Sequence, residues 1–168
     1  MRNLALFLAA VLVSWSPHSI AEDGVFNVVS PIPFADDSGA SNNVKEECTL
    51  ETRLPQFIAE AAKRGVKVVI GPAPEEGAEG KYLYMEFTHI MGAGGGAWSG
   101  PKSVTATGKL IENGEVIGSF ISSRFSTGGA FGGYKGTCSI LGRCIKAMGK
   151  DIAAWLRSPT MDAHLGDA

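Results

Sequence analysis

The side chains that most often do chemistry are scarce in this sequence. It has three histidines among 168 residues, and two of them, His89 and His164, lie beyond residue 21. No paired-histidine, His-x-Glu or Cys-x-x-Cys spacing occurs, which removes the common zinc-binding patterns. His89 alternates with Phe87 on an expected strand, so we expect a half-buried, inward-facing histidine rather than a catalytic base. The sequence therefore predicts a protein that is not an enzyme, with no catalytic residue, metal site or cofactor.

Glycine is the one abnormal count, at 22 residues, roughly double the ordinary share. Many glycines lie in residues 92–100 and 128–136, where backbone N–H groups invite a phosphate-binding interpretation. Neither segment fits a nucleotide motif, because Gly136 separates Lys135 from Thr137 and the first segment leads into a strand. We interpret both segments as bent or flexible connections. They carry the candidate contact residues Trp98, Phe131, Tyr134 and Lys135.

Charge and composition exclude further classes. The chain has 15 basic and 17 acidic residues and a net charge of −2, whereas a nucleic-acid-binding protein normally shows a basic stripe. Glu75, Glu76 and Glu79 stand in a loop rich in glycine and proline, where we expect a solvated surface rather than an acid–base pair. An apolar fraction of 45% is enough for one domain with its own core.

The sequence contains three cysteines, Cys48, Cys138 and Cys144, and their pairing depends on whether the cellular compartment is oxidising. In an oxidising compartment two of the three are expected to pair. If Cys138 and Cys144 are both helical, they lie about 9 Å apart along the axis, beyond the ~7 Å limit between Cα atoms. That bridge therefore requires Cys138 to lie before the helix and fold back. We favour a Cys48–Cys138 disulfide, because both residues directly precede helices where loops can meet, with Cys144 buried.

Residues 1–21 have the pattern of a cleaved signal peptide. Arg2 precedes an apolar run at residues 4–15, and Ser19 and Ala21 supply small residues before an expected cleavage at Glu22. The run is too short to cross a bilayer, and no cysteine follows it, so we expect no transmembrane segment after cleavage and no lipid anchor. The expected location is the periplasm of a Gram-negative bacterium. The alternative is a buried amino-terminal helix.

Hydrophobic periodicity predicts one α+β domain over residues 22–158 and a flexible tail at residues 159–168. Strands are expected at residues 25–34, 66–70 and 81–91. A first helix is expected to start near Thr52, since Pro55 then falls in its first turn, and a second runs from Ile140 to Leu156. A mixed, largely antiparallel sheet with both helices on one face satisfies both apolar helix stripes and leaves the other sheet face open.

The clearest local signal is Asn113-Gly114 between two β-rich runs, which predicts a two-residue type I′ hairpin. This turn pairs Ile111 with Val116 and Leu110 with Ile117, and counting outward by twos divides the strands into two faces. The expected core face holds Val104, Ala106, Leu110, Ile117 and Ile121. The expected open face holds Thr105, Thr107, Lys109, Ser122 and Arg124, with Phe120 and the Ile111–Val116 pair as apolar exceptions. Tyr82 and Tyr84 of the preceding strand lie on the same face.

The region from Tyr82 to Trp155 resembles a known family in its glycine and apolar pattern. The pattern comprises GAGGG at residues 92–96, VTATGKL at 104–110, GEVIGSF at 114–120 and a closing amphipathic helix. It resembles the exported bacterial proteins and lipoproteins grouped as DUF4410. It is similar, more distantly, to the small α/β domains of the curli secretion lipoprotein, the TolB amino-terminal domain and penicillin-binding-protein activators. The resemblance implies a non-enzymatic envelope component that docks on other proteins or assembles into rings.

Three functional hypotheses remain open at this point. The leading one is a soluble periplasmic accessory protein that binds an envelope partner or another copy of itself. Its contacts would come from the open face around Tyr82 and Tyr84 or from the glycine segments around Trp98 and Phe131. The second is an enzyme or small-ligand binder built on the glycine segments, with Lys135 and His89 as polar groups. The third is an inhibitor or immunity-type protein that blocks an envelope enzyme.

Overall fold

The computed structural model describes residues 24–62, 66–75, 77–92, 101–127 and 136–168. The predicted signal peptide at residues 1–21 and the candidate contacts Trp98, Phe131, Tyr134 and Lys135 lie outside these residues. Within them, the elements follow in this order: β1 (Val25–Val29), α1 (Asn42–Glu47), α2 (Leu50–Ala62), β2 (Lys67–Gly71), β3 (Lys81–Met91), β4 (Lys102–Glu112), β5 (Glu115–Ser126), α3 (Thr137–Trp155) and β6 (Ala163–Gly166).

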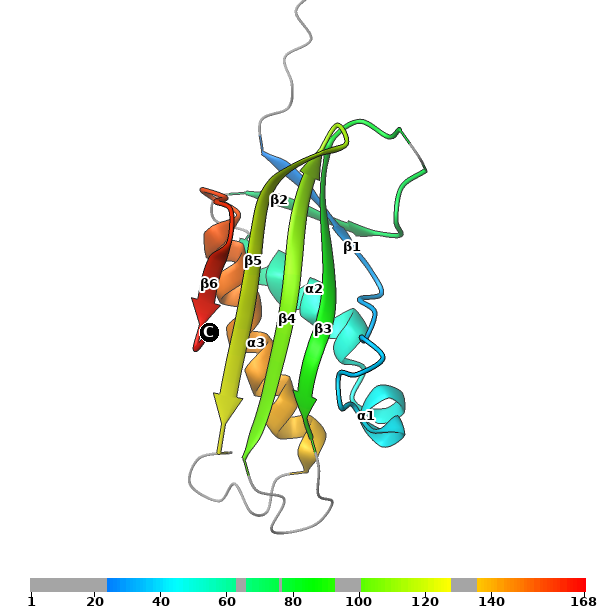
Figure 1. Ribbon diagram of the computed structural model, residues 1–168, viewed down its shortest axis with the longest axis vertical. Helices are drawn as coiled ribbons and strands as arrows, with labels where there is room; N and C mark the ends of the chain where they lie inside the picture. The colour runs from blue at the N-terminus through cyan, green and yellow to red at the C-terminus, as the bar shows by residue number, and fades with distance from the viewer. Residues whose placement is uncertain (1–23, 63–65, 76, 93–100, 128–135) are drawn as a thin grey trace, which may run out of the picture.

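The strands form one mixed sheet in the order β2-β1-β3-β4-β5-β6. β1 runs parallel to both of its neighbours, β3, β4 and β5 are antiparallel, and β6 runs parallel to β5. α2 and α3 lie together against one face of this sheet (Figure 1), which confirms the expected α+β fold. Across the part of the chain that the structure describes, no helix is long and apolar enough to cross a membrane.

Local hydrogen bonds explain the two helices that precede β2. α1 begins where the Ser41 side chain accepts a hydrogen bond from the Val44 N–H. α2 begins at Leu50, two residues earlier than expected, and Pro55 lies inside it. Proline has no N–H, so the Glu51 carbonyl lacks its helical donor. The N–H of Ile32 donates to that carbonyl at 3.0 Å, so the proline is accommodated through the segment after β1.

The Cys48–Cys138 disulfide is confirmed, with 4.8 Å between the two Cα atoms. It joins the end of α1 to the first turn of α3 and so connects the helices across 90 residues of sequence. Cys144 is the free cysteine and is buried, as expected. Burial raises the pKa of its thiol to about 11. The thiol therefore stays protonated near neutral pH, where a reactive cysteine would be a thiolate.

The hairpin between β4 and β5 has the expected turn. Asn113 and Gly114 have φ angles of 52° and 85°, and a type I′ turn requires positive φ at both central positions. Ile111 pairs with Val116, as the two-residue turn predicts. The turn therefore follows directly from the Asn-Gly dipeptide.

The register beyond that first pair differs from the expectation. Leu110 pairs with Gly118 rather than with Ile117, because β5 contains a bulge at this point. One extra residue in a strand moves every later side chain to the other face. The assignment of the next residues was therefore wrong: Phe120, Ser122 and Arg124 face the helices, and Ile121 faces away from them.

A second bulge changes the position of His89. β3 keeps its expected alternation up to Phe87, but the register shifts between Phe87 and His89. His89 then pairs with Thr105, and Ile90 takes the buried position beside Val104. The expected inward-facing histidine is therefore exposed, because the bulge reverses the phase of the strand after Phe87.

The end of the chain is ordered as β6 rather than the expected flexible tail. Asp162 and Ser119 are linked by two hydrogen bonds: the Ser119 hydroxyl donates to the Asp162 carboxylate at 2.9 Å and accepts from the Asp162 N–H at 2.8 Å. Arg124 donates to Asp151 of α3 at 2.7 and 2.8 Å, and to Asp167 at 3.1 Å. The hydrogen bond to Asp151 raises the pKa of Arg124. These contacts hold β6 against β5 and α3.

Candidate functional site

The sheet face turned away from α2 and α3 is the candidate site, and we call it the outer face. Its side chains lie in cross-strand rows that follow from the register of β3 to β6. These rows are Tyr82, Ile111 and Val116; Tyr84, Lys109 and Ser119; Glu86, Thr107, Ile121 and His164; His89, Thr105 and Ser123; and Met91, Ser103 and Phe125.

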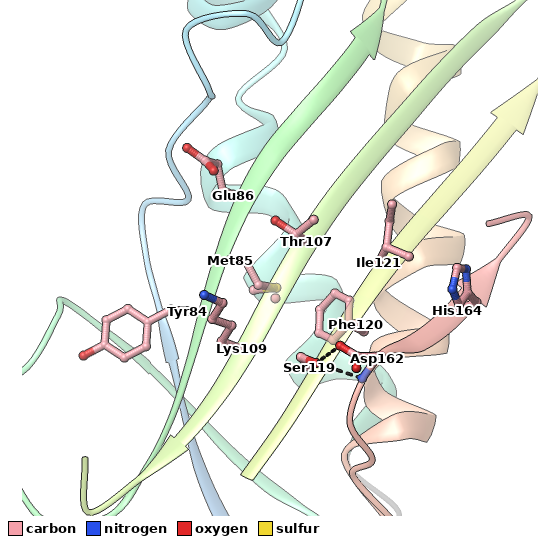
Figure 2. A pocket seen from close by; sticks show the side chains of 11 residues that line it. Tyr84, Met85, Glu86, Thr107, Lys109, Ser119, Phe120, Ile121, Asp162 and His164 are labelled. Carbon is pink, nitrogen blue, oxygen red and sulfur yellow. Dashed lines mark hydrogen bonds between the residues drawn. The ribbon is translucent and has the colours of Figure 1, made fainter. Parts of the chain in front are cut away.

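The middle of the outer face is hollowed. A depression of about 510 Å³ runs across β3, β4 and β5 to the segment that begins β6. Figure 2 shows Tyr84 and Glu86 on one side of it, Lys109 and Thr107 along the middle, and His164 on the far side. The depression therefore brings together strands that are distant in the sequence, including the carboxyl-terminal one.

A second depression of about 520 Å³ adjoins the first at Tyr84. Tyr82 and Ile111 line its base, and the loop that contains Glu75 and Glu79 forms its wall. The side chain of Asn113 accepts a hydrogen bond from the Gly80 N–H at 3.3 Å, which ties this loop to the hairpin. Tyr84 thus lines both depressions, and Tyr82 lines the second one.

The floor of the first depression depends on a glycine. Gly108 pairs with Phe120 across β4 and β5, and the Phe120 ring lies against it on the helix side. A Cβ atom at Gly108 would overlap that ring. The ring in turn packs edge-on against Trp155 of α3, with 4.9 Å between the ring centroids. Gly108 therefore lets the sheet and helix layers close tightly beneath the outer face.

Large apolar side chains are exposed on the outer face. Phe125 is 53% exposed, Val116 39%, Met91 37% and Ile121 36%. Met91 and Phe125 lie in one cross-strand row, joined through Ser103. Single exposed apolar residues are ordinary, whereas a contiguous apolar patch indicates an interaction site, and the row that contains Met91 and Phe125 is where two of these four side chains come together.

The polar groups of the outer face form no catalytic arrangement among the residues that the structure describes. Glu86 and Lys109 are exposed carboxylate and ammonium groups, and Thr105 and Ser123 share a hydrogen bond of 3.1 Å between their hydroxyls. In the described ranges no three His, Cys, Asp or Glu side chains are grouped so as to hold a metal ion. The surface can offer hydrogen bonds and apolar contacts to a partner.

The structure brings together only part of what the sequence analysis proposed. Tyr82 and Tyr84 lie on the outer face, whereas the role of the glycine-segment residues stays a prediction. His89 lines neither depression of this face. Ile121 and Phe125 were not predicted to lie on this face, because the bulge in β5 hides their orientation. His164 was not predicted there, because β6 is too short to give a periodic signal.

The chain is similar in structure to several solved proteins. Two are PelC dodecamers from Paraburkholderia phytofirmans: one is 20% identical, with a TM-score of 0.45 over 76% of this chain and 87% of that one. The other is 19% identical, with a TM-score of 0.46 over 82% and 89%. Protein XCC0632 from Xanthomonas campestris, of the family DUF330, is 11% identical, with a TM-score of 0.47 over 87% and 90%. No family model and no curated protein matches the chain. Likenesses of this strength support no inference about function.

Proposed function

We propose that the protein is a non-enzymatic accessory protein of the bacterial cell envelope, which binds another protein or a second copy of itself through its outer face. The observation that carries this proposal is the exposure of Ile121, Phe125 and Met91 on a sheet face that none of the described helices covers. Aromatic and methionine side chains are enriched in protein–protein interfaces. Tyr82 and Tyr84 extend the same surface toward the hairpin.

The proposed compartment is the periplasm. Residues 1–21 have the composition of a signal peptide, and the Cys48–Cys138 bridge belongs to the kind of covalent link that persists in oxidising compartments. Both features support export, and the resemblance to DUF4410 proteins points the same way.

A second candidate function is the binding of a small polar ligand in the depression of about 510 Å³. Its volume falls within the range of known ligand sites. The mixture of Tyr84, Glu86, Lys109 and His164 on its rim favours a ligand with several hydrogen-bonding groups.

Two variants test the proposed function. Ile121→Ser with Phe125→Ser removes exposed apolar surface from the outer face, and Ile70→Ser removes exposed apolar surface from the helix side of the edge strand β2, where Ile70 pairs with the buried Val28. We expect the wild type and the β2 variant to self-associate in light scattering or to recover the same envelope protein, and the outer-face variant to lose that contact. Equal behaviour of both variants, or a monomeric wild type that recovers no protein, would contradict the proposal.

A further inference from the structure

The solvent-exposed side of the helix layer carries a row of positive charges. On α3 and the turn after it, Arg143, Lys146, Lys150 and Arg157 are all exposed. Their spacings of three, four and seven residues place them along one side of the helix. The row extends over 14 residues, or about 21 Å at the rise of an α-helix.

α2 adds a fifth cation next to this row. Arg53 lies against Gly142 of α3, where a Cβ atom would come within 3.1 Å of its guanidinium. Arg53 and Lys146 both lie over the ring of Phe57, at 5.6 and 5.8 Å from its centroid. These residues line a hollow of about 490 Å³ between the helices, and no acidic residue is among those that line it. We call this hollow together with the α3 row the cationic face.

Few acidic residues accompany these charges on the two helices α2 and α3. Within α2 and α3, which the structure describes in full, Glu60 is the one exposed carboxylate and Glu51 is half-buried. Asp151 turns to the other side and binds Arg124. A chain with a net charge of −2 thus gathers five of its 15 cations on one side. At physiological salt, fields are screened within ~8 Å, so the local charge dominates at close range.

We propose that the cationic face binds a membrane surface of anionic phospholipid headgroups. The charges form an extended row, so a small anion meets only one or two of them, whereas a planar anionic surface meets them together. A protein partner fits less well, because the buried centre of a protein–protein interface is apolar and Ala154 is the one exposed apolar residue within the row on α3. The binding is electrostatic adsorption without insertion, and the hollow beside Phe57 receives a single headgroup phosphate.

Co-sedimentation with phosphatidylcholine vesicles, prepared with and without phosphatidylglycerol, tests this proposal. The protein is prepared without the expected signal peptide, residues 1–21, so the ratio of the two partition coefficients isolates the contribution of the charges that follow it. We expect Lys146→Gln with Lys150→Gln to reduce that ratio roughly 25-fold, because each lysine near an anionic surface raises the affinity roughly fivefold. The matched control is Lys45→Gln with Lys67→Gln, on α1 and β2, which removes the same charge and is expected to leave the ratio near that of the wild type.

Three outcomes would overturn the proposal. The first is equal partitioning of the wild type to both vesicle types, and the second is an equal loss in the two double variants. The third is binding to soluble polyglutamate or duplex DNA without binding to anionic vesicles, which would assign the cationic face to a polymer instead. Thermal unfolding by circular dichroism confirms that each variant folds. Because outer-face contacts are measured without lipid, failure here leaves the proposed function untouched.

Discussion

The outer face and the cationic face lie on opposite sides of the same two-layer domain and differ in composition. The outer face presents Ile121, Phe125 and two tyrosines, with charges of both signs in Glu86 and Lys109. The cationic face presents charges of one sign and almost no exposed apolar surface. The difference teaches that the sheet and the helix layer of this domain are suited to different partners, a protein surface and an anionic surface.

The disulfide offers the largest test of this contrast. We expect Cys48→Ser with Cys138→Ser to lower the free energy of unfolding by about 4 kcal/mol, because the bridge closes a long loop and restricts the unfolded chain. Urea titration measures the loss. Cys138 lines the hollow of the cationic face and does not line the depression of the outer face. We therefore expect the loss of the disulfide to weaken vesicle binding more than it weakens outer-face contacts. A loss of outer-face binding alone would argue that the two faces are not separate units.

The stability at alkaline pH depends on Cys144, whose thiol lies in the core between the two faces. Burial raises the pKa of Cys144 from 9.0 to about 11, so the folded state holds the thiol proton where the unfolded state has lost it. The resulting stability is fully present below pH 9 and is lost as the pH rises to about 11. Two pKa units correspond to at most about 2.7 kcal/mol. Denaturant titrations should show this decline, and Cys144→Ala should flatten it; an equally steep decline in the variant would refute the assignment to Cys144.

Arg124 links the layers, because it faces the helices from β5 and binds both Asp151 of α3 and Asp167 after β6. We expect Arg124→Ala to lower the free energy of unfolding by about 2 kcal/mol, since the partly buried carboxylate of Asp151 loses two charged hydrogen bonds and the exposed carboxylate of Asp167 loses one. The rate of amide hydrogen exchange should increase in residues 162–167, because the far side of the outer depression loosens. Vesicle binding by the cationic face should stay the same. Unchanged exchange in that segment would show that the backbone pairing with β5 alone holds β6.

Added salt should change the stability of the protein least and should distinguish the binding of the two faces most clearly. Raising ionic strength from ~0.1 to ~1 M shortens the Debye length from about 10 to about 3 Å. We expect vesicle binding through the cationic face to fall steeply and outer-face contacts to change little, with stability altered by less than ~0.5 kcal/mol. Binding assays at both salt concentrations compare the faces directly. Equal salt sensitivity would remove the contrast between them.

Much of the fold was predictable because its signals are local. The apolar stripe of α3 ends at Trp155 and Leu156, close to the expected limit, and the Asn113-Gly114 turn forms as its residues require. The choice of Cys48 and Cys138 was correct because a helix separates Cys138 from Cys144 by too great a distance. Tyr82 and Tyr84 lie on the expected strand face because they precede the bulge in β3, and their role as contact residues stays a prediction.

The sequence by itself determined the α+β class, the helix stripes and the hairpin turn, since each depends on a short periodic pattern or on a few neighbouring residues. Only the tertiary structure decided which residues face outward after each bulge, and hence that Ile121 and Phe125 belong to the outer face and Phe120 to the core. It also decided that residues 163–166 form a strand. The physical reason is the same in both cases: a bulge and a short edge strand are specified by the partner strand, and the local sequence does not contain that partner.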